Sequence, residues 1–254
     1  MFDLAFFTDV GLKRKHNEDS MLIDKKTATF IIADGMGGHA KGEIASKVVV
    51  ESFIDASNKN LSADTVTGID DEDTLIPSNA IEGILNDNIK KASKQLQIYA
   101  NEKNIKGTIG STIVGIKYII SIQAWILFHL GDSRAYLFRS NALRQLTRDH
   151  SRYEELKKKN MSEEDIAKSG RNVITKAIGN FSPFPLEIQY ITTQKEDILF
   201  LCSDGVSDLC THDELLILFI QYQHNLSLLS AQIKQLVYSR GAGDNLSVIL
   251  LKIQ

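Results

Sequence analysis

The chain has 254 residues, of which 43% are hydrophobic and 24% are charged, and its net charge is −3. A chain of this length can bury enough apolar surface to fold without a disulfide or a structural metal, and its composition excludes a disordered protein. The small net charge gives no basis for binding nucleic acid or an anionic membrane, so neither is expected as a partner.

The cysteines and the N-terminus predict a soluble protein of the cytoplasm. Cys202 and Cys210 do not have the spacing of a metal-binding or redox pair. Residues 1–5 lack the basic start and the uninterrupted apolar stretch of a signal peptide. The most apolar window, Tyr118–Leu130, is too short to span a bilayer.

The first half of the chain predicts one buried strand followed by two helices. Phe30–Ala33 is a compact apolar run that ends at an Asp-Gly pair, which is typical of a buried strand. Apolar residues recur on one helical face in Lys41–Ala56, and a second such stripe runs from Ile81 to Tyr99. Between these helices, the polar and acidic stretch Asp55–Pro77 predicts a surface loop.

The second half predicts further strands, a surface flap and two more helices. The stretch Trp125–Phe138 predicts a β-hairpin with Gly131-Asp132 at its turn, and the charged segment Leu146–Asn180 predicts a flap. No linker or repeat divides the chain, so one domain, 1–254, with an α+β layered fold is expected. The predicted strands are Ser111–Tyr118, Ala124–Leu130, Ala135–Phe138, Ile198–Cys202 and Leu246–Ile253, and the helices are Asp213–Gln223 and Leu228–Tyr238.

Four aspartates lie where predicted strands end or begin, namely Asp34, Asp132, Asp204 and Asp244. Carboxylates that converge on one cleft repel each other and raise each other's pKa values unless a cation neutralises them. Oxygen ligands without clustered Cys or His favour magnesium or manganese over zinc. Gly35, directly after Asp34, allows the backbone to turn and to bring a carbonyl to the ion. Any single Asp-Gly pair is equally typical of a turn, so the prediction depends on the whole set.

Two loops supply further candidates. Arg14 could hold a phosphate through its planar guanidinium group, and Glu18 and Asp19 could serve the metal site. On spacing alone, however, an exposed loop of mixed charge is the simpler interpretation of this segment. His39, in the glycine-rich loop after Asp34, could donate a proton because the pKa of histidine lies near neutrality.

Taken together, these segments resemble the type 2C protein phosphatases, the PPM family of metal-dependent serine/threonine phosphatases, and in particular its bacterial members. Eight stretches match in the order of the family and span nearly the whole chain. The resemblance implies an αββα sandwich, in which two central, mainly antiparallel β-sheets are flanked by helices and metals lie at one end between the sheets. It also implies a flap near residues 146–180. The matching stretches are Thr8–Ser20, Ala33–Ser46, Gly110-Ser111-Thr112, Gly131–Tyr136, Leu146–Ser151, Arg171–Gly179, Ser203–Asp208 and Gly241–Val248.

The resemblance implies two Mn²⁺ or Mg²⁺ ions, with a weaker third ion as in bacterial members. By motif position, Asp34 resembles the carboxylate that bridges the first two metals, and Gly35 resembles the residue that supplies a carbonyl. Asp204 and Asp244 resemble the remaining ligands of the first metal. Asp132 resembles the aspartate that helps to hold the third ion together with Asp204.

The remaining residues are assigned in the same way. Glu18 resembles the residue that reaches the second metal through water, with Asp19 supporting it. Arg14 resembles the arginine that binds the substrate phosphate, and His39 resembles the proposed general acid.

The function implied is hydrolysis of phosphoserine and phosphothreonine in proteins by a water molecule that bridges two cations. The expected partners are phosphorylated proteins and a serine/threonine kinase whose action the enzyme opposes, and a monomer is expected. A pseudophosphatase or regulatory module of the same fold is a second interpretation, against which the complete set of aspartates argues. The sequence also leaves open a hydrolase of small phosphoesters and a purely structural protein.

Overall fold

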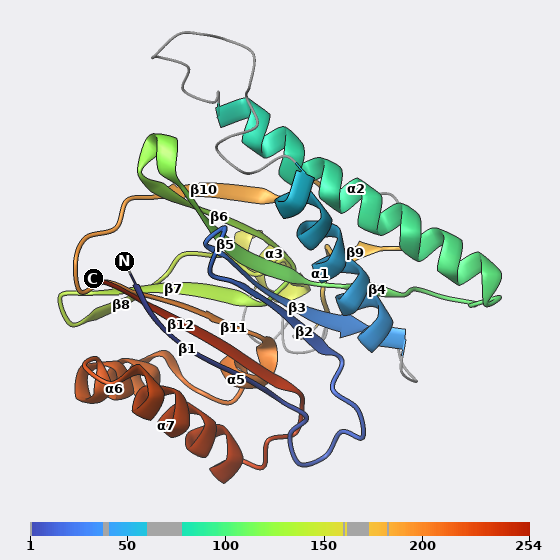
Figure 1. Ribbon diagram of the computed structural model, residues 1–254. Helices are drawn as coiled ribbons and strands as arrows, with labels where there is room; N and C mark the ends of the chain where they lie inside the picture. The colour runs from blue at the N-terminus through green and yellow to red at the C-terminus, as the bar shows by residue number, and fades with distance from the viewer. Residues whose placement is uncertain (1, 38–40, 60–77, 160, 162–172, 182) are drawn as a thin grey trace, which may run out of the picture.

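Two β-sheets form the centre of the computed structural model, and helices cover their outer faces (Figure 1). The structure describes residues 2–37, 41–59, 78–159, 161, 173–181 and 183–254. Helices α1 (Lys41–Lys59) and α2 (Ser78–Glu102) cover one sheet, and α6 (His212–Tyr222) and α7 (Leu226–Ser239) cover the other. This arrangement confirms the expected αββα sandwich.

Both sheets are antiparallel between the strands that pair. The first has the order β1-β12-β11-β7-β8, with bounds β1 Phe2–Asp9, β7 Arg134–Arg139, β8 Ala142–Gln145, β11 Ile198–Cys202 and β12 Leu246–Ile253. The second has the order β10-β6-β5-β3-β4-β9, and β2 pairs with β3 outside this path. Its bounds are β2 Asp19–Asp24, β3 Thr29–Met36, β4 Gly110–Ser111, β5 Ile113–Ile119, β6 Ala124–Leu130, β9 Ile178–Gly179 and β10 Glu187–Ile191.

The apolar runs of the sequence arise because the central strands are buried on both faces. Side chains alternate between the faces of a sheet, so in β3 Ile31 packs under the helices whereas Phe30 and Ile32 face the opposite sheet. On the outer faces, Phe53 of α1 stacks on Phe128, with ring centroids 5.4 Å apart. Three hydrophobic layers, two under the helices and one between the sheets, therefore hold the molecule together.

The predicted hairpin Trp125–Phe138 is wrong. Strand β6 pairs with β5 and β10, whereas β7 pairs with β11 and β8 in the other sheet. The chain therefore crosses between the sheets at Gly131, whose φ is +116° and whose Cβ, if one were present, would lie 2.6 Å from Cβ of Thr112. The sequence pattern reveals two buried strands and a turn, but it does not reveal which strands they pair with.

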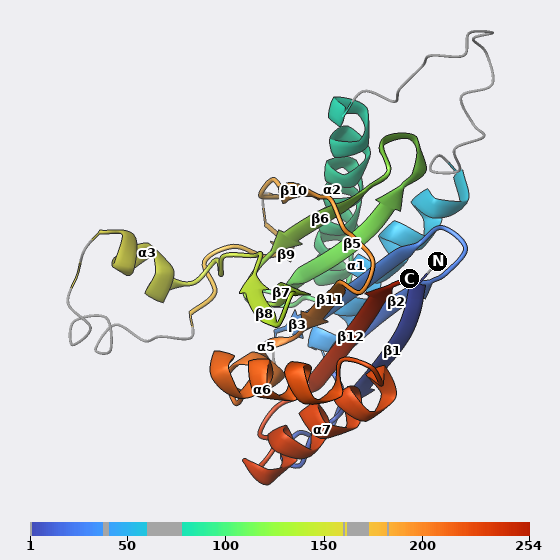
Figure 2. The same cartoon turned by 90° about the vertical axis from the view of Figure 1, so that its left-hand side faces the viewer.

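Two other predictions need adjustment. Helix α1 continues to Lys59, so residues 55–59 belong to the helix, and residues 60–77 of the predicted loop lie outside the described residues. The segment 146–180 contains α3 (Arg152–Lys158), which projects from the sandwich (Figure 2), and the segment returns to the sheet at β9. Among the described residues, no helix is long and apolar enough to cross a membrane.

Candidate metal centre

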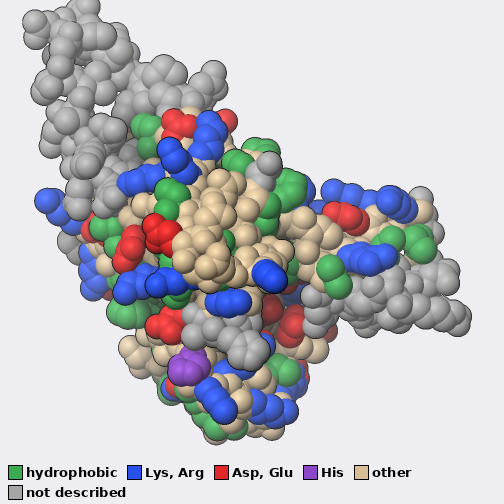
Figure 3. All heavy atoms as spheres, turned by 90° about the vertical axis from the view of Figure 1, so that its right-hand side faces the viewer, with side chains coloured by type: hydrophobic (Ala, Val, Ile, Leu, Met, Phe, Trp, Pro, Cys, Tyr) green, Lys and Arg blue, Asp and Glu red, His purple; other side chains and the backbone are tan. Residues whose placement is uncertain are grey.

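Five aspartates from separate parts of the chain meet at one end of the sandwich, between the sheets. Asp19 begins β2 and lies opposite Asp34 in the antiparallel register with β3. Asp204 is the first residue of the short helix α5 (Asp204–Ser207), directly after β11. Asp132 lies in the crossing from β6 to β7, and Asp244 lies in the turn before β12. Figure 3 shows this end of the molecule, where Asp and Glu side chains gather in a recess between surfaces that carry Lys and Arg.

Burial and mutual repulsion raise the pKa values of four of these carboxyl groups. Burial, with the charges of Asp19 and Asp204, raises the pKa of Asp34 well above its ordinary value. Burial and the charge of Asp204 raise the pKa of Asp132 to about 7. Burial raises the pKa of Asp204 to about 6 although a hydrogen bond with Asp34 opposes the shift, and burial raises the pKa of Asp19 to about 7. Without a cation, several of these groups must share or retain protons near neutral pH.

The donor atoms of this group fit Mg²⁺ or Mn²⁺. They are carboxylate and carbonyl oxygens, which are the ligands that these hard cations prefer. Within the part of the chain that the structure describes, Oδ1 of Asp132 and Oδ1 of Asp19 are buried without a hydrogen-bond partner. Buried polar atoms are normally paired, and an unpaired one requires an explanation such as an ion. Asp132 and Asp204 line the same cavity, and a cation bound there would satisfy this oxygen of Asp132.

Asp19 differs from the other four aspartates because two serine hydroxyl groups hold its carboxylate. Its Oδ2 accepts hydrogen bonds from Oγ of Ser203 at 2.9 Å and from Oγ of Ser247 at 2.7 Å. Ser203 directly precedes Asp204, and it also accepts the backbone N–H of Ser247. Asp19 therefore ties β2 to the strands that deliver Asp204 and Asp244.

The Gly110-Ser111-Thr112 motif holds the backbone of Asp34 on both sides. Oγ1 of Thr112 accepts the N–H of Asp34 at 3.1 Å, and the N–H of Thr112 donates to the Asp34 carbonyl at 2.8 Å. Oγ of Ser111 donates to that same carbonyl at 2.9 Å. Oγ1 of Thr112 also bonds Oγ of Ser133 at 2.8 Å. One threonine thus links the loop of Asp34 to the loop of Asp132.

Asn245 organises the N-terminal loop that carries Arg14 and Glu18. Its Nδ2 donates to the carbonyls of Val10 and His16, and its Oδ1 accepts the N–H of Glu18 at 2.8 Å. The loop is exposed from Leu12 to His16, as the simpler interpretation expects, and Asn245 holds its backbone on both sides of that stretch. The Gly243-Asp244-Asn245 sequence marked the position, but only the structure reveals what the asparagine side chain holds.

Glu18 and Gly35 meet at the start of α1. A Cβ at Gly42 would lie 2.6 Å from the Gly35 carbonyl oxygen and 2.8 Å from Cδ of Glu18. The carbonyl and the carboxylate therefore lie against the same glycine and close to one another. Gly35 itself has no room for a side chain, since its Cβ would lie 2.0 Å from the carbonyl oxygen of Gly42.

Arg14 extends over the centre from the exposed side. Its Nη2 donates to Oδ2 of Asp244 at 2.6 Å, and both side chains are partly exposed to solvent. The charges of Glu18 and Asp204 also act on this guanidinium group. His39, the remaining predicted residue, lies outside the described residues.

A cavity of about 180 Å³ adjoins Asp132 and Asp204 on the flap side. Its other lining residues were not predicted from the sequence. Among them, Asp149 accepts a bidentate hydrogen-bond pair from Arg134, with distances of 3.0 Å and 2.7 Å. The remaining lining residues are Ser151, Tyr153 and Asp208.

Comparisons with known proteins agree with this geometry. The family model described as protein phosphatase 2C matches residues 13–237. The serine/threonine phosphatase stp of Listeria welshimeri is 31% identical over 252 residues, which cover 97% of this chain and 94% of that protein. The structure of the serine/threonine phosphatase Stp1 from Staphylococcus aureus is 30% identical, covers 100% of this chain and 96% of its own, and has a TM-score of 0.79. The catalytic domain of the phosphatase PstP, in complex with two manganese ions, shares the fold with a TM-score of 0.81 at 23% identity, covering 100% of this chain and 99% of its own.

We predict that the metal-free protein loses stability as pH rises from about 4 to about 7. The folded protein holds protons on Asp132 up to a pKa of about 7, whereas the unfolded chain releases them near 3.8. A raised folded pKa stabilises the folded state below the unfolded value, and this contribution is lost as pH rises through the folded value. Calorimetric melting temperatures in chelator should therefore decrease across this range.

The comparison with Asp132→Asn isolates this contribution. The variant should have a smaller decrease in melting temperature than the wild type, and excess Mn²⁺ should reduce the pH dependence of the wild type. Identical pH profiles for the variant and the wild type in chelator would contradict the prediction.

Proposed function

This chain belongs to the protein phosphatase 2C family, and from that premise we propose which of its residues carry the reaction. The protein is a metal-dependent phosphatase that hydrolyses phosphoserine and phosphothreonine in proteins, with Mn²⁺ or Mg²⁺ as cofactor. The observation that carries the residue assignments is the group of buried carboxylates with raised pKa values at one end of the sandwich.

We assign Asp34, Asp204 and Asp244 to one ion, and Asp34, Glu18 and the Gly35 carbonyl to a second. Asp132 and Asp204 would hold a third. When bound, the cations neutralise the phosphate dianion and activate a water molecule. Asp19, which accepts hydrogen bonds from two serines, positions the strands around this centre and supports Glu18.

Arg14 is assigned to the substrate phosphate. It is exposed, it lies at the edge of the carboxylate group, and its guanidinium group can bind two phosphate oxygens at once. In the structure, this group pairs with Asp244. An ion on Asp244 would compete for that carboxylate and leave Arg14 available to phosphate.

His39 is assigned as the general acid from its place in the sequence motif. A serine or threonine alkoxide is a poor leaving group, and a proton donor would assist its departure.

We also propose that a serine/threonine kinase produces the substrates, and that the enzyme acts in the cytoplasm, which cell fractionation would test. We also propose that the enzyme is a monomer, which size-exclusion chromatography with light scattering would test.

Replacement of Asp204 tests the metal assignment. Asp204→Asn should lower the turnover of a phosphothreonine peptide at least about 10³-fold, equivalent to about 4 kcal/mol of transition-state stabilisation. The fold should persist, as followed by circular dichroism. Asp87→Asn, which changes an exposed aspartate of α2, is the matched control and should retain full activity. Near-normal turnover of Asp204→Asn at normal metal occupancy would refute the assignment.

Replacement of Arg14 tests phosphate binding. Arg14→Ala should raise KM for the phosphopeptide about 10- to 100-fold, which is the effect of losing a charge-assisted hydrogen bond, with a smaller change in kcat. Lys15→Ala removes the same charge from the same loop and should leave KM nearly unchanged. Equal effects of the two variants would mean that Arg14 contributes only general electrostatic attraction.

Replacement of His39 tests proton donation. His39→Gln should lower kcat about 10²- to 10⁴-fold for a phosphothreonine peptide. The loss should be much smaller for p-nitrophenyl phosphate, whose leaving group needs no proton. Steady-state kinetics on both substrates give this ratio, and an equal loss on both would exclude the general-acid role.

A further inference from the structure

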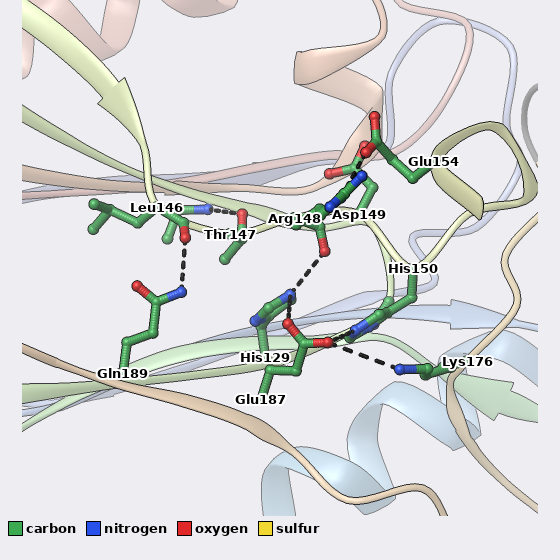
Figure 4. Close-up of polar contacts among 12 residues, drawn as sticks. His129, Leu146, Thr147, Arg148, Asp149, His150, Glu154, Lys176, Glu187 and Gln189 are labelled. Carbon is green, nitrogen blue, oxygen red and sulfur yellow. Dashed lines mark hydrogen bonds and ion pairs between the residues drawn. The ribbon is translucent and has the colours of Figure 1, made fainter. Parts of the chain in front are cut away.

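Two stacked histidines, His129 and His150, lie next to one another (Figure 4), and His150 bonds the backbone of Gly131, the residue before Asp132. His129 is near the end of β6, and His150 lies between β8 and α3, where the flap segment leaves the sheet. Their rings are nearly parallel, at 3°, with centroids 4.9 Å apart. Both side chains are buried, and neither has a role in the function proposed above.

His150 holds both backbone groups of Gly131. The N–H of Gly131 donates to Nδ1 of His150 at 3.0 Å, and the N–H of His150 donates to the Gly131 carbonyl at 2.9 Å. Because Nδ1 accepts a hydrogen bond, it carries no proton. The proton of the neutral ring is therefore on Nε2, which donates to Oε1 of Glu187 at 2.7 Å.

Glu187 anchors this chain of hydrogen bonds on the edge strand β10. It lies opposite His129 in the register of β10 with β6. Burial opposes ionisation of Glu187, but the hydrogen bond from His150 lowers its pKa overall, so it is a carboxylate. Nζ of Lys176 lies 3.8 Å from Oε1 of Glu187, and the adjacent N–H of Thr175 donates to the His150 carbonyl. Figure 4 shows Lys176 and His150 on either side of Glu187, and through His150 these residues connect both ends of the flap segment to Gly131.

The hydrogen bonds argue against a metal ion between these side chains, although one ligand atom from each of His129, His150 and Glu187 lies within 4.8 Å of the others. A metal on Nε2 of His150 would require the proton to move to Nδ1, where it would face the N–H of Gly131. Nε2 of His129 lies 3.0 Å from the Arg148 carbonyl oxygen and must donate to it. Both Nε2 atoms therefore carry hydrogen.

The turn at Gly131 needs such support. Its φ of +116° is a conformation that only glycine adopts readily, and glycine restrains the backbone least. The next residue, Asp132, has a buried Oδ1 without a hydrogen-bond partner. To bind a cation, this oxygen must be held at a fixed place. Gly131 has no side chain that could pack, so hydrogen bonds to its backbone, together with the Thr112–Ser133 bond, restrain this turn.

We propose that His150 and Glu187 are positioning residues, which hold the Gly131 peptide so that Asp132 can bind its cation. This inference rests on the proposed function, because it assumes that Asp132 is a metal ligand. Residues around a metal site that orient its ligands typically alter metal affinity or activity 10- to 100-fold when they are replaced. Replacing either residue should therefore weaken binding of the ion at Asp132 and leave the affinities of the other two metal sites unchanged.

Two matched pairs of variants test the inference. In His150→Asn the amide can replace Nδ1 and accept the Gly131 N–H, whereas in His150→Gln it reaches only toward Glu187. Glu187→Gln keeps an oxygen that accepts the Nε2 hydrogen, whereas Glu187→Ala removes it. His150→Gln and Glu187→Ala should weaken binding of the ion that depends on Asp132 about 10- to 100-fold, while Glu187→Gln should stay within about threefold. His150→Asn keeps the bond to Gly131 but loses the anchor on Glu187, so its loss should not exceed that of Glu187→Ala. Gln189→Ala, on the same strand, loses a bond to the Leu146 carbonyl and is the control.

The measurement is Mn²⁺ binding without substrate, by calorimetry or electron paramagnetic resonance, with Asp132→Asn as the reference. Thermal unfolding in chelator checks folding, and the partly exposed Glu187 supplies variants that fold if those of His150 do not. Combining Asp132→Asn with Glu187→Ala should cause no further loss of the ion.

Each outcome separates the inference from the function on which it rests. If Asp132→Asn loses an ion and neither His150→Gln nor Glu187→Ala does, the positioning role is refuted and the proposed function stands. If Asp132→Asn binds all ions normally, the assignment of Asp132 fails and the inference fails with it. A visible Co²⁺ spectrum that disappears in His129→Ala would show a metal between the histidines and would also refute the inference.

Discussion

Mutual repulsion among buried carboxylates is the constraint on which the rest of this structure depends. Asp34, Asp132 and Asp204 lie where burial and neighbouring charges raise their pKa values. Side chains in such a position would move apart if the backbone allowed it. They remain together because each is at or next to the end of a strand that is buried on both faces, and because hydroxyl and amide groups hold the intervening loops. The two-sheet architecture therefore supplies what a single loop could not, which is convergence of like charges from opposite sides.

Polar contacts link the ends of the strands around the site, although most of the packing between the sheets is apolar. Thr112 bonds both Asp34 and Ser133, Asp19 accepts hydrogen bonds from Ser203 and Ser247, and Asn245 holds Glu18. A hydroxyl or amide group has a defined direction, so these bonds set the relative position of the strand ends more sharply than the apolar contacts between the sheets do. The hydrophobic layers bring the sheets together, and the buried hydrogen bonds align their ends.

The difference between apolar packing and directed hydrogen bonds explains what the sequence could and could not predict. The bounds of β6, β11 and β12 follow from the sequence because strands buried on both faces form largely apolar runs. Edge strand β10, with an exposed and mixed pattern, has no such run and was not predicted. The hairpin was wrong because an apolar run reveals burial but not the neighbouring strand. The carboxylates were found through their Asp-Gly and Gly-Asp motifs. The two histidines are 21 residues apart and Glu187 is 37 residues beyond His150, so these three side chains meet only in the fold.

The separation of the hydrophobic layers from the carboxylate site also indicates which part of the molecule stabilises the fold. Carboxylates with raised pKa values oppose folding at neutral pH when no cation is bound, and the two cysteines, which are free and buried, form no cross-link. The free energy that offsets this destabilisation must come from parts of the molecule that do not contact the site. The outer layers fit this requirement, since Phe219 of α6 packs on Phe138 and Phe200 beneath the helices. A core that is stable independently of the site allows the strand ends to hold charges in an arrangement that favours an ion over the empty state.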